Sequence, residues 1–107
     1  MQGKKITPYE GCVIYILESK CGKYRYIGGT SDFHKRKIHH KYRCTNPTSL
    51  EHEYKVYSKI RQTGGYLEYD FRVLEDNINV MSRKELSIIE KKYIELIRPN
   101  LNTYLVK

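Results

Sequence analysis

The sequence predicts a small mixed α/β (α+β) domain with three strands and about three helices. Two observations support this prediction. Two compact β-type segments stand close together near the start of the chain, and a third strand pattern lies between segments with helical spacing. The 107 residues, of which 39% are hydrophobic, fit one domain with a modest core. We expect this domain to span residues 11–103, between tails at residues 1–10 and 104–107.

An antiparallel hairpin is predicted first. Residues 12–17 form a β-branched run that contains Tyr15, which indicates a buried strand. A polar turn, with Gly22 as its expected positive-φ residue, leads to a second strand over residues 24–28. Because the link is short, the strands should pair as a hairpin, in which Tyr15 and Tyr26 can lie near each other.

A helix with a basic face should follow. Ser31 or Asp32 would supply the N-cap of a helix over residues 33–43, whose apolar anchoring would come only from Phe33, Ile38 and Tyr42. At 100° per residue, three basic side chains fall within an arc of roughly 60° and could contact phosphates: Arg36, His40 and Arg43. The same helix carries further lysines that could bind a polyanion or simply be solvated: Lys35, Lys37 and Lys41.

The middle of the chain predicts a second helix and a third strand. Thr48, with Glu51 three residues later, has the pattern of a capping box, and Gly64–Gly65 would end the helix. The helix would have an apolar stripe, most simply part of the core, made of Leu50, Tyr54, Tyr57 and Ile60. Strict alternation over residues 67–73 then predicts a strand with one solvated face, followed by a loop over residues 75–80.

The last helix contains an unusual carboxylate. Ser82 and Glu85 form a second capping box, and the helix should end before Pro99. Glu90 lies near the middle of its apolar stripe, which consists of Leu86, Ile89, Tyr93, Ile94 and Ile97. An inward-facing carboxylate costs stability unless it is paired or binds a cation. We therefore expect Glu90 either to pair with a Lys or Arg, or to hold one hard divalent cation with waters and phosphate oxygens.

Composition restricts the class of partner and the compartment. Lys and Arg number 20 against 12 Asp and Glu, and the net charge of +8 favours a polyanionic partner such as a nucleic acid. No signal peptide or membrane-spanning run is apparent. The three cysteines lack the spacing of a disulfide framework, which is typical of a reduced intracellular protein rather than a secreted one. Cys44, His39 and His40 lack a second pair of ligands for zinc.

These residue types suit phosphodiester hydrolysis. That reaction needs a base to activate water, a cation to stabilise charge on the phosphoryl oxygens, and stabilisation of the leaving oxygen. A tyrosine, with an ordinary pKa of about 10, can be the base only if a neighbouring group draws its proton away. Taken singly, each of these residues has an equally good structural explanation. The two tyrosines could pack in the hairpin, Arg36 could simply anchor a phosphate, and His40 could be a solvated helix residue.

Two tripeptides of the hairpin resemble the signature of the GIY-YIG nuclease family. The first appears as Val13-Ile14-Tyr15, with Val in place of the usual Gly, and the second is intact as Tyr26-Ile27-Gly28. The replaced glycine lies in a strand, so we expect the change to affect packing more than chemistry.

The other positions of the family pattern occur in order along the chain. Arg36 stands eight residues after Gly28, and His40 comes one helical turn later. Glu90 opens the segment Glu-Lys-Lys-Tyr-Ile, and Asn102 closes the segment Pro-Asn-Leu-Asn. The resemblance covers nearly the whole chain.

This resemblance implies a three-stranded antiparallel sheet flanked by helices, and DNA cleavage with one divalent cation, Mg²⁺ or Mn²⁺. It also implies a function for each matched residue: Tyr15 as general base assisted by His40, Tyr26 positioning water or phosphate, Arg36 stabilising the pentacoordinate phosphoryl group, Glu90 holding the metal, and Asn102 bracing the site. The lysines of the basic helix, together with Arg43, would bind the DNA.

Two alternatives remain open. One is a nucleic-acid-binding module that kept the fold and lost catalysis, and the other is a small basic scaffold or ribosome-associated protein. For a nuclease we expect a monomer or a transient dimer on DNA. Its selectivity would come from DNA structure, from a partner, or from a separate recognition domain if the chain is a catalytic fragment.

Overall fold

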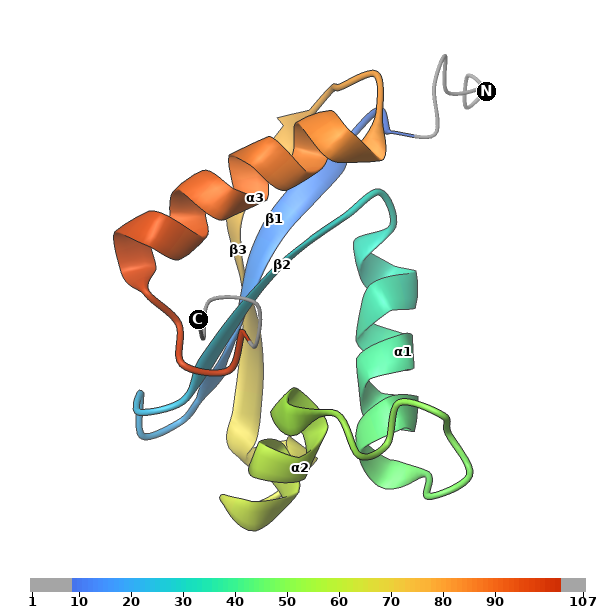
Figure 1. Ribbon diagram of the computed structural model, residues 1–107, viewed down its shortest axis with the longest axis vertical. Coiled ribbons are helices and arrows are strands. Elements are labelled where there is room, and N and C mark those ends of the chain that lie inside the picture. Colours follow the sequence, from blue (N-terminus) through green and yellow to red (C-terminus); the bar gives the residue numbers. More distant parts are fainter. Residues whose placement is uncertain (1–8, 103–107) are drawn as a thin grey trace.

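The computed structural model describes residues 9–102. Most of the expected N-terminal tail, the last residue of the expected domain and the whole expected C-terminal tail lie outside the described residues. Three strands and three helices succeed one another along the chain (Figure 1). They are β1 Cys12–Ser19, β2 Arg25–Thr30, α1 Phe33–Thr45, α2 Lys55–Gln62, β3 Tyr69–Ile78 and α3 Arg83–Ile97, with a short 3-10 helix, η1 Tyr66–Glu68, before β3. None of the helices described here combines the length and apolar character that crossing a bilayer requires.

The strands form one antiparallel sheet in the order β2-β1-β3, which confirms the predicted α+β class. In the β1-β2 hairpin, Tyr15 lies opposite Gly28 and Leu17 lies opposite Tyr26. Because alternate residues of a strand share a face, Tyr15 and Tyr26 are diagonal neighbours on one face of the sheet. The turn between the strands contains Gly22 at φ +79°, as expected.

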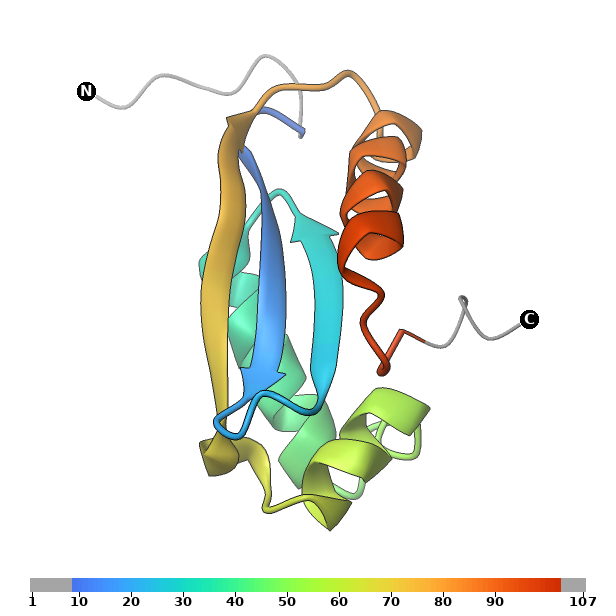
Figure 2. The ribbon, with the colours of Figure 1, turned by 90° about the vertical axis from the view of Figure 1, so that its left-hand side faces the viewer.

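Both faces of the sheet are covered. Figure 2 shows α3 beside β2 and α1 behind the strands. On one face, Ile14 and Ile16 of β1 cluster with Leu86 and Ile94 of α3. On the other face, Leu17 clusters with residues of α1 and α2. A central strand that is buried on both faces is apolar along its length, which explains the continuous apolar run in the sequence.

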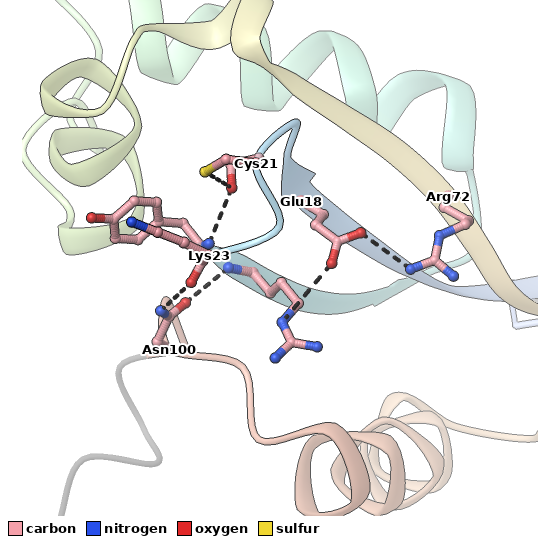
Figure 3. A network of polar contacts seen from close by, with 8 residues as sticks. Glu18, Cys21, Lys23, Arg72 and Asn100 are labelled. Carbon is pink, nitrogen blue, oxygen red and sulfur yellow. Dashed lines mark hydrogen bonds and ion pairs between the residues drawn. The ribbon is translucent and has the colours of Figure 1, made fainter.

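The segment after α3 runs along the free edge of β2. The Asn100 side chain accepts a hydrogen bond from the Arg25 amide at 2.8 Å and donates to the Lys23 carbonyl at 2.7 Å (Figure 3). The Asn102 side chain accepts from the Ile27 amide at 2.9 Å and donates to the Ile27 carbonyl at 2.7 Å. The two amide side chains therefore replace the neighbouring strand that an edge lacks.

The helix α1 is capped as predicted but anchored differently. Asp32 is the N-cap, and its side chain accepts a backbone N–H of the first turn. Ile38 and Tyr42, two of the expected anchors, are 54% and 50% exposed, whereas the buried residues of the helix are His40 and Cys44. The prediction of these anchors was wrong because hydrogen bonds allow a polar ring to take the inward position.

The start of α2 differs from the prediction. The helix begins at Lys55 without a side-chain cap, and Leu50, an expected member of its stripe, is 93% exposed. The carboxamide oxygen of Asn46 accepts both the amide of Thr48, at 2.9 Å, and its hydroxyl, at 2.7 Å. The predicted capping box of Thr48 and Glu51 was wrong because this local turn uses the groups that would have capped a helix.

The strand β3 is longer than predicted. It begins at Tyr69, after Leu67, which is 80% exposed in η1, and continues to Ile78 through most of the expected loop. The pairing with β1 shifts register between Ile14 and Tyr15. This irregularity breaks the alternation of the pattern, so the second half of the strand does not show the period of two that identifies its first half.

The ends of α3 largely agree with the sequence. The Ser82 hydroxyl accepts the Glu85 amide at 3.2 Å, as a capping box requires. The Glu85 carboxylate accepts the amide of Met81, at 2.9 Å, instead of the amide of the cap residue itself. The helix ends at Ile97, and Arg98 comes next in the left-handed region at φ +56°, before the proline.

Candidate active site

A hydrogen-bonded chain of three rings connects β1, α1 and α2. The Tyr15 hydroxyl lies 2.6 Å from Nε2 of His40, and Nδ1 of His40 lies 2.8 Å from the Tyr57 hydroxyl. Tyr26 of β2 packs edge-on against the same imidazole, with ring centroids 5.6 Å apart. The Tyr15 side chain is fully buried and His40 is 2% exposed, so these bonds are made away from bulk water.

Burial determines the protonation of these rings. Burial, assisted by the guanidinium of Arg36, lowers the pKa of His40 to about 3, so the imidazole is neutral near pH 7. Burial raises the pKa of Tyr15 well above its ordinary value. Burial, with a contribution from the Glu90 carboxylate, raises the pKa of Tyr26 to about 12. A neutral imidazole donates from one nitrogen and accepts at the other, so Nε2 can accept the Tyr15 proton only when Nδ1 is protonated.

Gly28 and Gly29 leave room for two of the predicted side chains at the edge of the sheet. A Cβ at Gly28 would collide with the Tyr15 hydroxyl, and a Cβ at Gly29 would lie 2.9 Å from Oε1 of Glu90. Successive residues of a strand face opposite sides, so Tyr15 and Glu90 lie on opposite faces of the sheet. The two faces meet at the free edge of β2.

Two guanidinium groups meet at this edge. The carbonyl oxygen of Gly29 accepts from Nη1 of Arg36 at 3.4 Å and from Nη1 of Arg83 at 3.0 Å. Arg36 also donates to the Tyr15 hydroxyl, at 3.5 Å, so both of its hydrogen bonds are long. The Glu90 carboxylate, which pairs with Arg83, offsets one of the two positive charges, so the charge of Arg36 remains to attract an anion to this edge.

Glu90 faces inward, as predicted, and is paired. It is 8% exposed, and its Oε1 lies 3.2 Å from Nη2 of Arg83. The ion-pair alternative is therefore the one that the structure shows. Hydrogen bonds connect Glu90 to Arg36 indirectly. Arg83 donates to Glu90 and to the Gly29 carbonyl, and Arg36 donates to the same carbonyl.

Glu90 could be one protein ligand of a metal ion, but the side chains around it do not supply a full set of protein ligands. Within residues 9–102, no group of three or more His, Cys, Asp or Glu side chains could hold a metal ion, and Cys44, His39 and His40 do not form one. Glu90 supplies one hard carboxylate in the space that Gly29 leaves. This donor set fits Mg²⁺, which usually keeps several waters and binds phosphate oxygens of the substrate.

A cleft of about 420 Å³ opens beside the ring chain, lined by Tyr26, Arg36, His40, Arg43, residues 54–57 and Leu101. Four of the predicted site residues, Tyr26, Arg36, His40 and Arg43, thus line one cleft, while Tyr15 is not part of its lining. Glu90 and Arg83 line a second hollow, of about 400 Å³, along α3. The predicted site residues therefore border two hollows, one on each side of the edge of β2.

The other predicted residues have different surroundings. Asn102 is 1% exposed, and its side chain bonds to the backbone of β2 next to Tyr26 and Gly28. It braces the strand rather than lining the cleft. The lysines of α1 lie outside the cleft lining: Lys35 and Lys41 are exposed, and the ammonium of Lys37 lies over the Phe33 ring, 4.8 Å from its centroid.

Two contacts of the site were not predicted. The sequence places Tyr57 in the apolar stripe of α2, yet its hydroxyl bonds to His40. Its hydroxyl has no signal in the sequence, because the contact depends on how α2 packs against α1. Arg83 does have a signal: a spacing of seven residues places it within about 20° of Glu90 on a helical wheel.

Comparison with known proteins gives no relative for this chain. No protein-family model, no curated protein and no solved structure matches it. Its function must therefore be inferred from the arrangement of side chains around the edge of β2.

Proposed function

We propose that this chain is a DNA endonuclease of the GIY-YIG type, which hydrolyses phosphodiester bonds with one divalent cation. The observation that carries this proposal is the meeting of Arg36 and Arg83 at the Gly29 carbonyl, between a buried Tyr–His pair and a carboxylate. A phosphate bound at this edge would gain two guanidinium contacts. A proton acceptor and a metal ligand would lie on either side of it, which is the combination that hydrolysis needs.

Tyr15 would act as the general base, and His40 would receive its proton. The hydrogen bonds of Arg36 are long, so its guanidinium can exchange them for phosphate oxygens and uncover the Tyr15 hydroxyl. As that hydroxyl takes a proton from the attacking water, it passes its own proton to Nε2 of the neutral imidazole. The phenol is thereby regenerated, and the positive charge remains on His40.

Tyr26 and Arg36 would act on the phosphate itself. Because its pKa is raised to about 12, Tyr26 stays protonated at neutral pH and can donate a hydrogen bond from the cleft wall. Arg36 would stabilise the charge that develops on the pentacoordinate phosphoryl group. Asn102 would keep the β2 backbone, and hence the Tyr26 ring, in place.

Glu90 would hold the divalent cation, Mg²⁺ or Mn²⁺, and Arg83 would be its partner until substrate arrives. When bound, the cation would supply charge stabilisation for the phosphoryl and leaving oxygens. The Arg83 side chain is 46% exposed, so it can turn toward an incoming phosphate and release the carboxylate.

A second candidate is a nucleic-acid-binding module that has lost catalysis. Its support is specific: Glu90 is already paired with Arg83, and Tyr15 is fully buried. Both candidates share a DNA partner, which suits the net charge of +8, and an intracellular location. They differ only in whether the bound strand is cut.

The experiment that separates them is cleavage of supercoiled, linear, branched and single-stranded DNA in Mg²⁺, in Mn²⁺ and in EDTA. One site cuts one strand at a time, so a nuclease should convert supercoiled plasmid to open circles before linear DNA appears, and only with metal. Binding to every form of DNA without cleavage of any would contradict the nuclease and support the binding module.

A further inference from the structure

The cleft lined by Tyr26, Arg36 and His40 extends past them to side chains that the proposed chemistry does not use. These are Arg43 of α1, together with Tyr54 and Lys55 at the start of α2. A site that bound only the reacting phosphate would not need them. Their properties therefore indicate what else occupies the cleft.

The aromatic part is an open platform. Tyr54 keeps 58% of its surface exposed, although it lies in the cleft lining. Its ring stacks on Tyr57 with an interplanar angle of 18° and a centroid distance of 6.5 Å. The underlying ring is nearly buried, at 3% exposure, and supports the outer one. Rings presented in this way bind nucleobases by stacking, with little dependence on base identity.

The charged part of the lining is positive. It contains Arg36, Arg43 and Lys55, and no aspartate or glutamate is among the residues that line it. Nε of Arg43 lies 3.6 Å from Glu51, outside the lining, and both side chains are about one-third exposed, so this pair is screened by water. The cleft thus combines an aromatic platform with cations, as sites for single-stranded nucleic acid do.

The dimensions favour one nucleotide. A volume of about 420 Å³ lies within the range of about 300–1,000 Å³ typical of small-molecule sites. A base inside a duplex is stacked and paired and cannot enter such a hollow, whereas an unpaired base can. We propose that this cleft is a subsite for one unpaired nucleotide next to the scissile phosphate, with its base on Tyr54 and its phosphate at Lys55 and Arg43. The inference rests on the proposed function and gives it a substrate class, DNA with a local unpaired nucleotide.

The test is the binding of two fluorescent duplexes in EDTA, one fully paired and one carrying a single bulged nucleotide. The wild-type chain should bind the bulged duplex roughly tenfold more tightly, since one base stacked on an aromatic ring gives about this factor. Tyr54→Ala should remove the preference, and Tyr54→Phe, which keeps the ring, should retain it. Equal affinity of the wild-type chain for the two duplexes would overturn the inference.

Tyr42→Ala is the matched control, because Tyr42 is a tyrosine of similar exposure, 50%, outside the cleft lining. It should leave the preference unchanged. Lys55→Gln gives an independent measurement: it should reduce the slope of log K against log salt by about one for bulged DNA only. A preference that survives Tyr54→Ala, or an equal loss of slope on both duplexes, would contradict the subsite.

Binding in EDTA is measured without catalysis, so the two proposals fail separately. A chain that prefers bulged DNA but cuts nothing in Mg²⁺ would retain the subsite and lose the nuclease assignment. A chain that cuts DNA but has no preference for the bulge would retain the nuclease and lose the subsite.

Discussion

The Tyr15 hydroxyl and Nε2 of His40 lie 2.6 Å apart, and neither side chain is accessible to bulk water. Burial raises the pKa of the phenol and lowers that of the imidazole to about 3, so the proton rests on Tyr15 until the reaction moves it. The direction of that movement depends on which nitrogen of His40 already carries a hydrogen.

Tyr57 should select the productive tautomer, because its hydroxyl lies 2.8 Å from Nδ1. Tyr57→Phe removes this acceptor and keeps the ring. We expect the cleavage rate to fall roughly tenfold or more, as for other groups that orient a reacting histidine, and the free energy of unfolding to fall by about 1–3 kcal/mol. Nitrogen NMR shifts of His40 should show loss of the Nδ1-protonated form.

Tyr66→Phe, which removes a hydroxyl that donates to the Lys37 carbonyl, is the control. An unchanged tautomer would contradict this function of Tyr57.

The buried imidazole should also make stability depend on pH. An unfolded His takes up a proton near its ordinary pKa of about 6.5, whereas folded His40 does so only near 3. The unfolded state therefore binds more protons between these values, and the free energy of unfolding should fall as pH decreases from about 6.5, by at most about 1.4 kcal/mol per unit.

Urea titrations of the wild-type chain and His40→Gln isolate this effect. The difference between the two should change with pH below about 6.5 and be constant above it. His34→Gln removes an exposed imidazole of the same helix that is not among the groups acting on the pKa of His40, so its curve should match that of the wild type. If wild type and His40→Gln differ by the same amount at all pH values, His40 is not held neutral by burial.

Much of the fold could be predicted because local patterns and final packing agree. The hairpin, the N-caps at Asp32 and Ser82, and the stop before the proline after α3 depend on neighbouring residues alone. The errors arose where distant contacts decided the outcome. The strand β3 continues past its pattern because β1 provides a partner, and α2 starts late because Asn46 satisfies its own turn.

The sequence predicted which residues belong to the candidate site better than it predicted how they are arranged. Spacing placed Glu90 on an inward stripe and put Arg36 one turn from His40, and both placements hold. The division of the site by the edge of β2 results from the register of Gly28 and Gly29, and register depends on strand pairing.

Releasing Glu90 from its ion pair should strengthen metal binding. In Arg83→Gln the carboxylate loses a competing cation, so the Mg²⁺ or Mn²⁺ concentration for half-maximal thermal stabilisation should fall roughly two- to fivefold. Arg72→Gln is the matched control, because Arg72 pairs with Glu18 at the same 3.2 Å, away from the site (Figure 3). If both variants bind the metal as the wild type does, Glu90 is not its ligand.

Gly29→Ala should displace the Glu90 carboxylate, since the new Cβ would lie 2.9 Å from Oε1. We expect the free energy of unfolding to fall by about 1–3 kcal/mol. Because the carboxylate would be misplaced in the site, we also expect cleavage to be slower by roughly tenfold or more. Glu90→Asp shortens the acid and makes room for the methyl group. In a double-mutant cycle, Gly29→Ala should therefore cost less in the Glu90→Asp background, and an additive cycle would show that the two positions do not touch.

The most direct test of the nuclease assignment is single-turnover nicking by Glu90→Gln in Mg²⁺, with DNA affinity measured on the same substrate. Gln keeps the shape of Glu90 and removes the charge that would hold the cation. If the edge of β2 is a phosphodiesterase site, cleavage should fall roughly 100-fold or more, while DNA binding is retained. Nicking by Glu90→Gln at the wild-type rate would contradict the assignment.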